Sequence, residues 1–133
     1  MRVTRDLRSE EAVRLLIKLL GLNHIHPKKV RVVRSNSKSM AYARLWGLSK
    51  VLQVGLDIKP SYVIELIDRN FSKLDCSEKV RIVVHELMHI PKTFSGHVRP
   101  HNEVFKKELR KYLRILRKLK NSSEFQRICK LLS

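Results

Sequence analysis

The residues best able to do chemistry lie together in the run His85-Glu86-Leu87-Met88-His89, an HExxH motif. On a helix, side chains four positions apart lie one above the other, so His85 and His89 can reach one ion. Neutral imidazole nitrogens bind zinc at about 2.0–2.1 Å. Glu86 points in a neighbouring direction, where its carboxylate can take a proton from a metal-held water and pass it to a leaving amine. The spacing therefore predicts one zinc ion per chain, with Glu86 as the catalytic residue.

An open catalytic zinc site needs a third protein ligand. His97 and His101 follow the motif within one short loop. His101 is the preferred ligand, because the loop is long enough to fold back and return it to the metal at the start of the next helix. The alternatives are His97 and a carboxylate, for which Glu103 and Glu108 are the nearby choices.

Two residues of the same loop have a second interpretation. His97 or Arg99 could stabilise the oxyanion of a transition state without binding the metal. The motif also has interpretations without catalysis: two ordinary helix histidines, or a purely structural metal site. A structural zinc site usually completes its ligand set with cysteine, and the motif contains none.

The HExxH motif needs a buried helix to hold it. Asp75 and Glu78 have the spacing of a capping box, which predicts a helix beginning at Asp75. Pro91 requires the helix to end at or before that residue. Between these limits an apolar stripe would bury the helix against a sheet. Its members are Val80, Val83, Val84 and Leu87.

The remaining segments predict an α+β fold within a single domain, residues 1–133. Apolar spacing predicts helices at 10–20, 102–120 and 122–132. Short apolar or β-branched runs predict strands at 30–34, 40–46, 50–58 and 62–67, with 40–46 and 50–58 paired as a hairpin. The expected layout is an N-terminal helix, a three- to four-stranded, mainly antiparallel sheet, the motif-bearing helix and C-terminal helices.

The charge balance indicates a polyanionic partner. Lys and Arg number 29 and Asp and Glu 12, a formal net charge of +17. Such an excess attracts nucleic acid, although a solvated, highly charged surface is the alternative. On the predicted helix 102–120 four cations line the side opposite the apolar stripe, and they are candidates for DNA contact: Lys107, Arg110, Arg114 and Lys118. A basic nucleic-acid-binding protein with a structural or inactive metal site is therefore the alternative function.

Targeting and redox features point to the cytoplasm. The apolar runs are far shorter than the ~20 residues that cross a bilayer, and the N-terminal residues lack a secretory pattern. We expect a cytoplasmic protein with no membrane partner. Cys76 and Cys129 form no CxxC motif, so they are expected as reduced thiols.

The segment from Tyr62 to Asn102 resembles the phage-type metallopeptidases and, more distantly, the SprT-like zinc metallopeptidases. The resemblance covers about forty residues and is strongest in HELMHIPKTFSGHVRPH. It implies a zincin-like fold, zinc bound by His85, His89 and His101, and Glu86 as the general base.

The same resemblance also implies how a substrate would bind. An edge strand would lie above the cleft and pair with an extended peptide substrate. Its residues would be Tyr62, Val63, Ile64, Glu65 and Leu66. The implied function is hydrolysis of peptide bonds, with DNA-associated proteins as the substrates that the SprT-like relation suggests. A metal-dependent hydrolase of other substrates is a further alternative, and the oligomeric state is not predicted.

Overall fold

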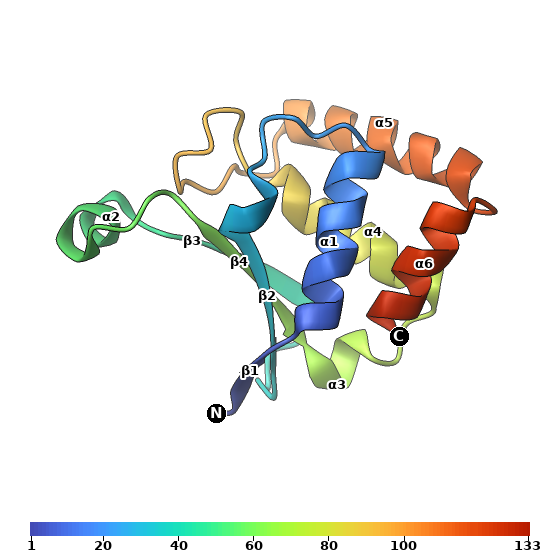
Figure 1. Cartoon of the computed structure of the whole chain (residues 1–133), viewed down its shortest axis with the longest axis horizontal. Coiled ribbons are helices and arrows are strands. Elements are labelled where there is room, and N and C mark those ends of the chain that lie inside the picture. Colours follow the sequence, from blue (N-terminus) through green and yellow to red (C-terminus); the bar gives the residue numbers. More distant parts are fainter.

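A four-stranded mixed sheet carries helices on one of its faces (Figure 1). The computed structural model describes the whole chain, residues 1–133. The strands follow the order β1 (Val3–Arg5), β2 (Val30–Ser35), β4 (Tyr62–Ile67) and β3 (Ala43–Gly47). The two outer pairings are antiparallel, as expected, but the central pair β2–β4 is parallel. The chain passes through β3 at the far edge before it returns as β4, and this return makes β4 parallel to β2.

The two faces of the sheet differ in their surroundings because side chains alternate along a strand. Val30 and Val32 of β2, with Tyr62, Ile64 and Leu66 of β4, are buried in the core beneath the helices. Arg31, Arg44 and Trp46 alternate with core-facing positions and are exposed to solvent. The open face is therefore polar and cationic over much of its area.

The four long helices agree with the predicted segments to within three residues at each end. They are α1 (Leu7–Leu19), α4 (Cys76–Met88), α5 (Glu103–Leu119) and α6 (Ser123–Leu132), with short turns η1 (Pro27–Lys29) and α3 (Asp68–Phe71). The start of α1 lies earlier than the apolar pattern indicated, because the Asp6 carboxylate accepts a hydrogen bond from the Ser9 backbone N–H. No helix of the chain combines the length and apolar character that crossing a bilayer demands.

The predicted strand at 50–58 is wrong, because the segment forms helix α2 (Lys50–Leu56). The Ser49 side chain accepts a hydrogen bond from the Leu52 backbone N–H and so caps the helix. Asp57 then ends it in the left-handed conformation, at φ 54°. These two end signals outweigh the strand preference of the β-branched residues between them, so no hairpin forms with β3.

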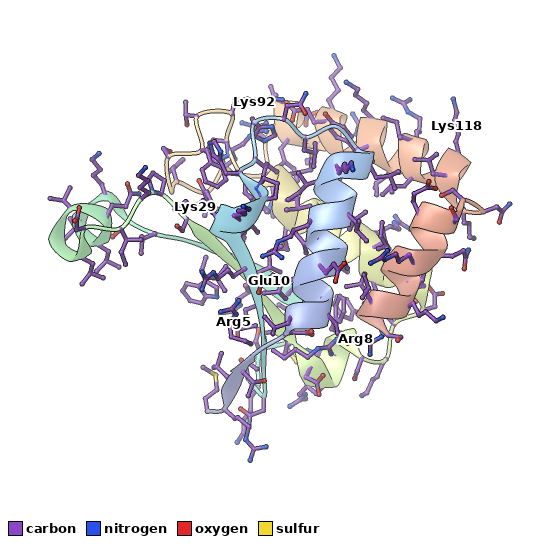
Figure 2. All side chains as sticks on the ribbon, in the orientation of Figure 1. Arg5, Arg8, Glu10, Lys29, Lys92 and Lys118 are labelled. Carbon is purple, nitrogen blue, oxygen red and sulfur yellow. A yellow bond between two sulfur atoms is a disulfide. The ribbon has the colours of Figure 1, made fainter.

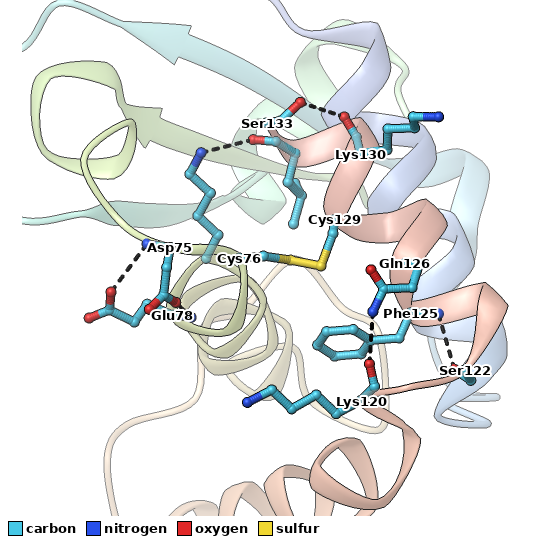
Figure 3. The surroundings of a disulfide bond; sticks show 12 residues. Asp75, Cys76, Glu78, Lys120, Ser122, Phe125, Gln126, Cys129, Lys130 and Ser133 are labelled. Atoms are coloured by element: carbon cyan, nitrogen blue, oxygen red, sulfur yellow. Dashed lines mark hydrogen bonds between the residues drawn. A yellow bond between two sulfur atoms is a disulfide. The ribbon is translucent and has the colours of Figure 1, made fainter.

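The expectation of reduced thiols is also wrong, because Cys76 and Cys129 form a disulfide (Figure 3). Their Cα atoms lie 5.4 Å apart, within the usual range for this bond. Cys76 is the first residue of α4 and lies within the predicted capping box, which is confirmed by reciprocal hydrogen bonds between Asp75 and Glu78. The bond joins the start of the motif-bearing helix to the C-terminal helix α6.

A buried carboxylate joins β1, α1 and β2. The Glu10 side chain is almost fully buried, and both of its oxygens accept hydrogen bonds of 2.9 Å from the Arg5 guanidinium (Figure 2). Arg14 and the Val32 backbone N–H donate to the same carboxylate at 3.3 Å. Buried charge is tolerated here because every oxygen has a cationic or N–H donor.

Candidate metal centre

The HExxH motif occupies the C-terminal end of α4. His85 and Glu86 lie in the last turn, and His89 is the residue that caps the helix end. The apolar stripe of α4 is buried in the core, so the helix direction is set by packing rather than by the site. The motif thus rests on a helix that is held at its start by the disulfide and along its length by the core.

The loop after α4 brings a third imidazole to the first two. Donor atoms of His85, His89 and His101 all lie within 4.8 Å of one another. The Nε2 atoms of His85 and His101 are only 2.9 Å apart. Two imidazole nitrogens this close must share a proton or a cation, because their lone pairs otherwise repel. Three imidazoles are the protein donor set of a catalytic zinc site, so these residues fit the ion that the sequence predicts.

Backbone hydrogen bonds fold this loop onto the end of α4. The Arg99 backbone N–H donates to the His89 carbonyl at 2.8 Å. The Arg99 carbonyl lies 2.6 Å from His89 Nδ1, which therefore carries the proton and donates it. Such a bond orients a ligating imidazole and leaves its Nε2 lone pair free for a metal.

An aromatic ring forms the floor of the three-histidine cluster. Phe105 of α5 is 1% exposed, and its ring centroid lies 5.3, 4.5 and 4.8 Å from those of His85, His89 and His101. The Asn102 side chain accepts a hydrogen bond from the Phe105 backbone N–H and so caps α5 directly after His101. The start of α5 thereby fixes the position of the third histidine.

Burial keeps two of the imidazoles neutral. Burial, together with the neighbouring His89 and His101, lowers the pKa of His85 to about 4. Burial also lowers the pKa of His89, against the opposing effect of its hydrogen bond to the Arg99 carbonyl. Because only the neutral imidazole binds a metal, these shifts reduce the competition from protons.

Glu86 contributes a buried carboxyl group beside His85 on the same helix. It is 8% exposed, and this burial raises its pKa to about 7, with a backbone hydrogen bond from Leu45 opposing the rise. A surface pocket of about 240 Å³ gives access to Glu86 and His89. The other residues of that pocket are Arg44, Leu45, Trp46 and Val98. A carboxyl group whose pKa lies near neutrality is suited to accept and return a proton.

The other candidate ligands lie outside the cluster. His97 is exposed and is not among the grouped residues, and its carbonyl accepts a hydrogen bond from the Tyr62 hydroxyl. The Arg99 guanidinium donates to the Glu108 carboxylate at 3.1 Å, so each of these groups already has one partner in the structure. The Glu103 side chain is 85% exposed and faces Lys106.

The interpretation of residues 62–66 as an edge strand is wrong. β4 lies between β2 and β3, so the backbones of Tyr62, Val63, Ile64, Glu65 and Leu66 are already paired on both sides. The edge strand beside the site is β3. Nothing in the composition of β4 reveals this, because strand order follows from the path of the chain between strands.

The free edge of β3 is short. Its pairing with β4 determines which of its backbone N–H and C=O groups point outward. The Tyr42 carbonyl accepts from the Ile67 N–H, and the Leu48 N–H donates to the Ser61 carbonyl. Because hydrogen-bonded and open positions alternate in an antiparallel pair, the backbone groups of Ala43 and Leu45 point away from β4. Leu45 also lines the pocket that holds Glu86.

Gly47 and Gly96 also shape the site, and neither was predicted to do so. A Cβ atom on Gly47 would overlap the carbonyl oxygen of Gly96, and one on Gly96 would overlap the carbonyl oxygen of Leu48. Gly96 also has φ 95°, and its N–H donates to the Tyr62 hydroxyl at 2.8 Å. The close approach seats the loop that leads to His101 on the end of β3. A glycine within a strand is the signal that could have indicated this contact.

The cations predicted on the last long helix lie on an exposed face of α5. Lys107, Arg110, Arg114 and Lys118 are all exposed, whereas Phe105 and Leu116 of the same helix are buried. No acidic residue occurs in α5 after Glu108. Beyond Glu108 the helix therefore presents a strongly cationic surface toward solvent.

Comparison with known proteins gives one result. The family model described as putative phage metallopeptidase matches residues 1–132. No curated protein and no solved structure matches the chain.

Proposed function

The chain belongs to the putative phage metallopeptidase family, and we propose that it is a zinc-dependent peptidase in which Glu86 is the general base. The observation that carries this proposal is the convergence of three imidazoles next to one buried carboxyl group of raised pKa. Bound zinc would supply a Lewis acid and lower the pKa of a water. Protein or peptide substrates follow from the family.

In this proposal, metal binding, proton transfer and the exclusion of water are the roles of different residues. His85, His89 and His101 hold the ion, and the Arg99 carbonyl orients His89. Glu86 takes the proton from the attacking water and delivers it to the leaving amine nitrogen. Phe105 excludes water from beneath the imidazoles.

We further propose that β3 binds the substrate backbone. The open backbone groups of Ala43 and the carbonyl of Leu45 can pair with an extended peptide, which would place its scissile bond beside Glu86, the partner of the Leu45 N–H. Arg44 and Trp46 line the adjacent pocket and would contact substrate side chains.

Replacing the base tests the mechanism. Glu86→Gln should retain the metal but lose at least about 10²-fold in turnover of an unstructured protein substrate, because the amide cannot accept the proton. Glu103→Gln is the matched control, since that side chain is exposed and outside the cluster. Turnover of Glu86→Gln at the wild-type rate would refute the role of Glu86.

Metal content tests the ligand set. Elemental analysis of purified protein should find about one zinc per chain, with a loss of binding in His101→Ala and none in His97→Ala. Zinc retained at full affinity by His101→Ala, or no zinc after reconstitution, would refute the proposed site.

A second candidate function is favoured by the charge of +17 and by the cationic face of α5. We propose that this face binds DNA and that the peptidase acts on DNA-associated proteins. Arg110→Gln combined with Arg114→Gln should weaken DNA binding uniformly across sequences. The slope of log affinity against log salt concentration should become shallower by about one for each lost phosphate contact. Lys50→Gln with Lys59→Gln is the charge-matched control at the other end of the molecule. Equal losses of DNA affinity in both double variants would show that binding depends on net charge alone and not on the face of α5.

A further inference from the structure

Helix α2 forms an apolar projection at the end of the molecule opposite α6 (Figure 1). Four of its side chains and one just beyond it are exposed: Val51 by 79%, Leu52 by 47%, Val54 by 70%, Leu56 by 59% and Ile58 by 45%. Scattered exposed aliphatic residues are ordinary, but five within eight positions form a patch. The metal centre and the cationic face of α5 do not involve this patch.

The fold holds α2 in place by polar contacts and turns its aliphatic side chains outward. Gln53 is the only buried residue of the helix, and its Nε2 donates to the carbonyls of Leu48 at 2.7 Å and Ser95 at 2.9 Å. Ser49 caps the start of the helix. This is the reverse of a core-packing helix, so exposure of the aliphatic side chains is built into the structure.

The charge and shape of the region around α2 indicate which kind of partner could cover this patch. Residues 22–64 carry eight Lys and Arg but only one acidic residue, Asp57, and Lys50 and Lys59 flank the patch. A second copy of the chain would bring the same excess of positive charge. Nucleic acid would match the charge, but α2 has no aromatic ring on which a base could stack. An anionic lipid surface offers both negative headgroups and an apolar layer for a convex tip.

We propose that α2 is a peripheral docking site for anionic lipid surfaces. Val51, Val54 and Leu56 enter the boundary between headgroups and acyl chains, and Lys50 and Lys59 contact the headgroups. The expectation of no membrane partner considered only segments that span a bilayer, which peripheral docking does not require. The proposal is independent of the metal centre.

Vesicle binding by the full chain tests the proposal. Sedimentation of the protein with vesicles measures its partition between water and lipid. Vesicles of phosphatidylglycerol and phosphatidylcholine should carry the protein into the pellet, and vesicles of phosphatidylcholine alone should do so far less. Val51→Ser with Val54→Ser should reduce the partition coefficient by about tenfold or more, because two aliphatic groups are lost from the lipid contact.

The control is Val104→Ser, which changes an exposed valine of α5 and should leave vesicle binding unchanged. Equal binding by the Val51→Ser/Val54→Ser variant and the wild type would overturn the proposal, since net charge would then account for adsorption. Self-association of the wild type that this variant abolishes, or loss of DNA binding with vesicle binding intact, would also overturn it in favour of a second copy or of nucleic acid.

Discussion

Helices α4 and α2 are both rich in aliphatic residues, but the fold uses them in opposite ways. In α4 the aliphatic stripe is buried in the core, a capping box begins the helix, and a disulfide ties its first residue to α6. In α2 the aliphatic residues face solvent, and one glutamine attaches the helix to the loop beside the metal centre. The three-histidine cluster therefore lies on a helix that is fixed in the core, whereas the exposed aliphatic side chains of α2 are free to contact another surface.

The largest expected effect compares one leucine from each helix. Leu87→Ala should lower the free energy of unfolding by about 2–5 kcal/mol, because Leu87 is fully buried and its removal leaves a cavity. Leu56→Ala removes an exposed side chain and should change stability by less than about 0.5 kcal/mol. Chemical denaturation of the two variants checks this. A comparable loss in both would show that the tip is packed against another molecule in solution.

Removing the disulfide should have the next largest effect. Cys76 and Cys129 are 53 residues apart in sequence, and opening a loop of this size typically costs about 2–4 kcal/mol. Cys76→Ser with Cys129→Ser, and the wild type under reducing conditions, should both unfold at lower denaturant concentration. Hydrogen exchange should become faster in α4 and α6 while that of α2 stays the same. Unchanged stability of the reduced wild type would contradict the structural role of this bond.

A smaller effect is expected where the two regions meet. Gln53→Ala leaves the Leu48 and Ser95 carbonyls without their side-chain donor, which should cost about 1–2 kcal/mol and speed hydrogen exchange in α2. Gln126→Ala is the matched control, because its side chain makes one exposed hydrogen bond to the Lys120 carbonyl. Faster exchange of α4 in Gln53→Ala would show that the tip and the metal-bearing helix are coupled more strongly than these contacts imply.

The smallest effect concerns two aspartates at helix ends, Asp6 at the start of α1 and Asp57 at the end of α2. Burial raises the pKa of Asp6, but hydrogen bonds from the Ser9 backbone and the Arg34 side chain, 2.6 Å away, outweigh it and the pKa is lowered overall. The ionised group therefore stabilises the fold above its usual pKa of about 3.8, and this contribution is lost as pH falls through the lower folded-state value.

Asp6→Asn should accordingly destabilise the protein by about 1 kcal/mol at neutral pH, with the difference from wild type vanishing in acid. Asp57→Asn should change stability by less than about 0.5 kcal/mol at neutral pH, because Asp57 makes no ion pair and asparagine tolerates the left-handed conformation. Denaturant titrations at several pH values check both. An Asp6→Asn deficit that persists in acid would contradict the charge-based explanation.

Features encoded within a few residues were predicted correctly. The capping box at Asp75 and Glu78, the end of α4 before Pro91 and the apolar stripes depend on local backbone and burial preferences. The preferred third histidine, His101, is the one that the structure brings to the pair on α4. Segment 50–58 was wrongly predicted as a strand. The helix caps formed by Ser49 and Asp57 outweigh the strand preference of the β-branched residues between them.

The amino-acid sequence by itself determined the four long helices, the HExxH pair on one helix face and the cationic surface of α5, because each follows from residue type at fixed short spacing. Only the tertiary structure decided that β3 is the edge strand, that Cys76 meets Cys129 and that Gly96 lies on Gly47. These contacts join segments far apart in the chain, and their pairing depends on the path between them and on the packing of the whole core. No short pattern of residues carries that information.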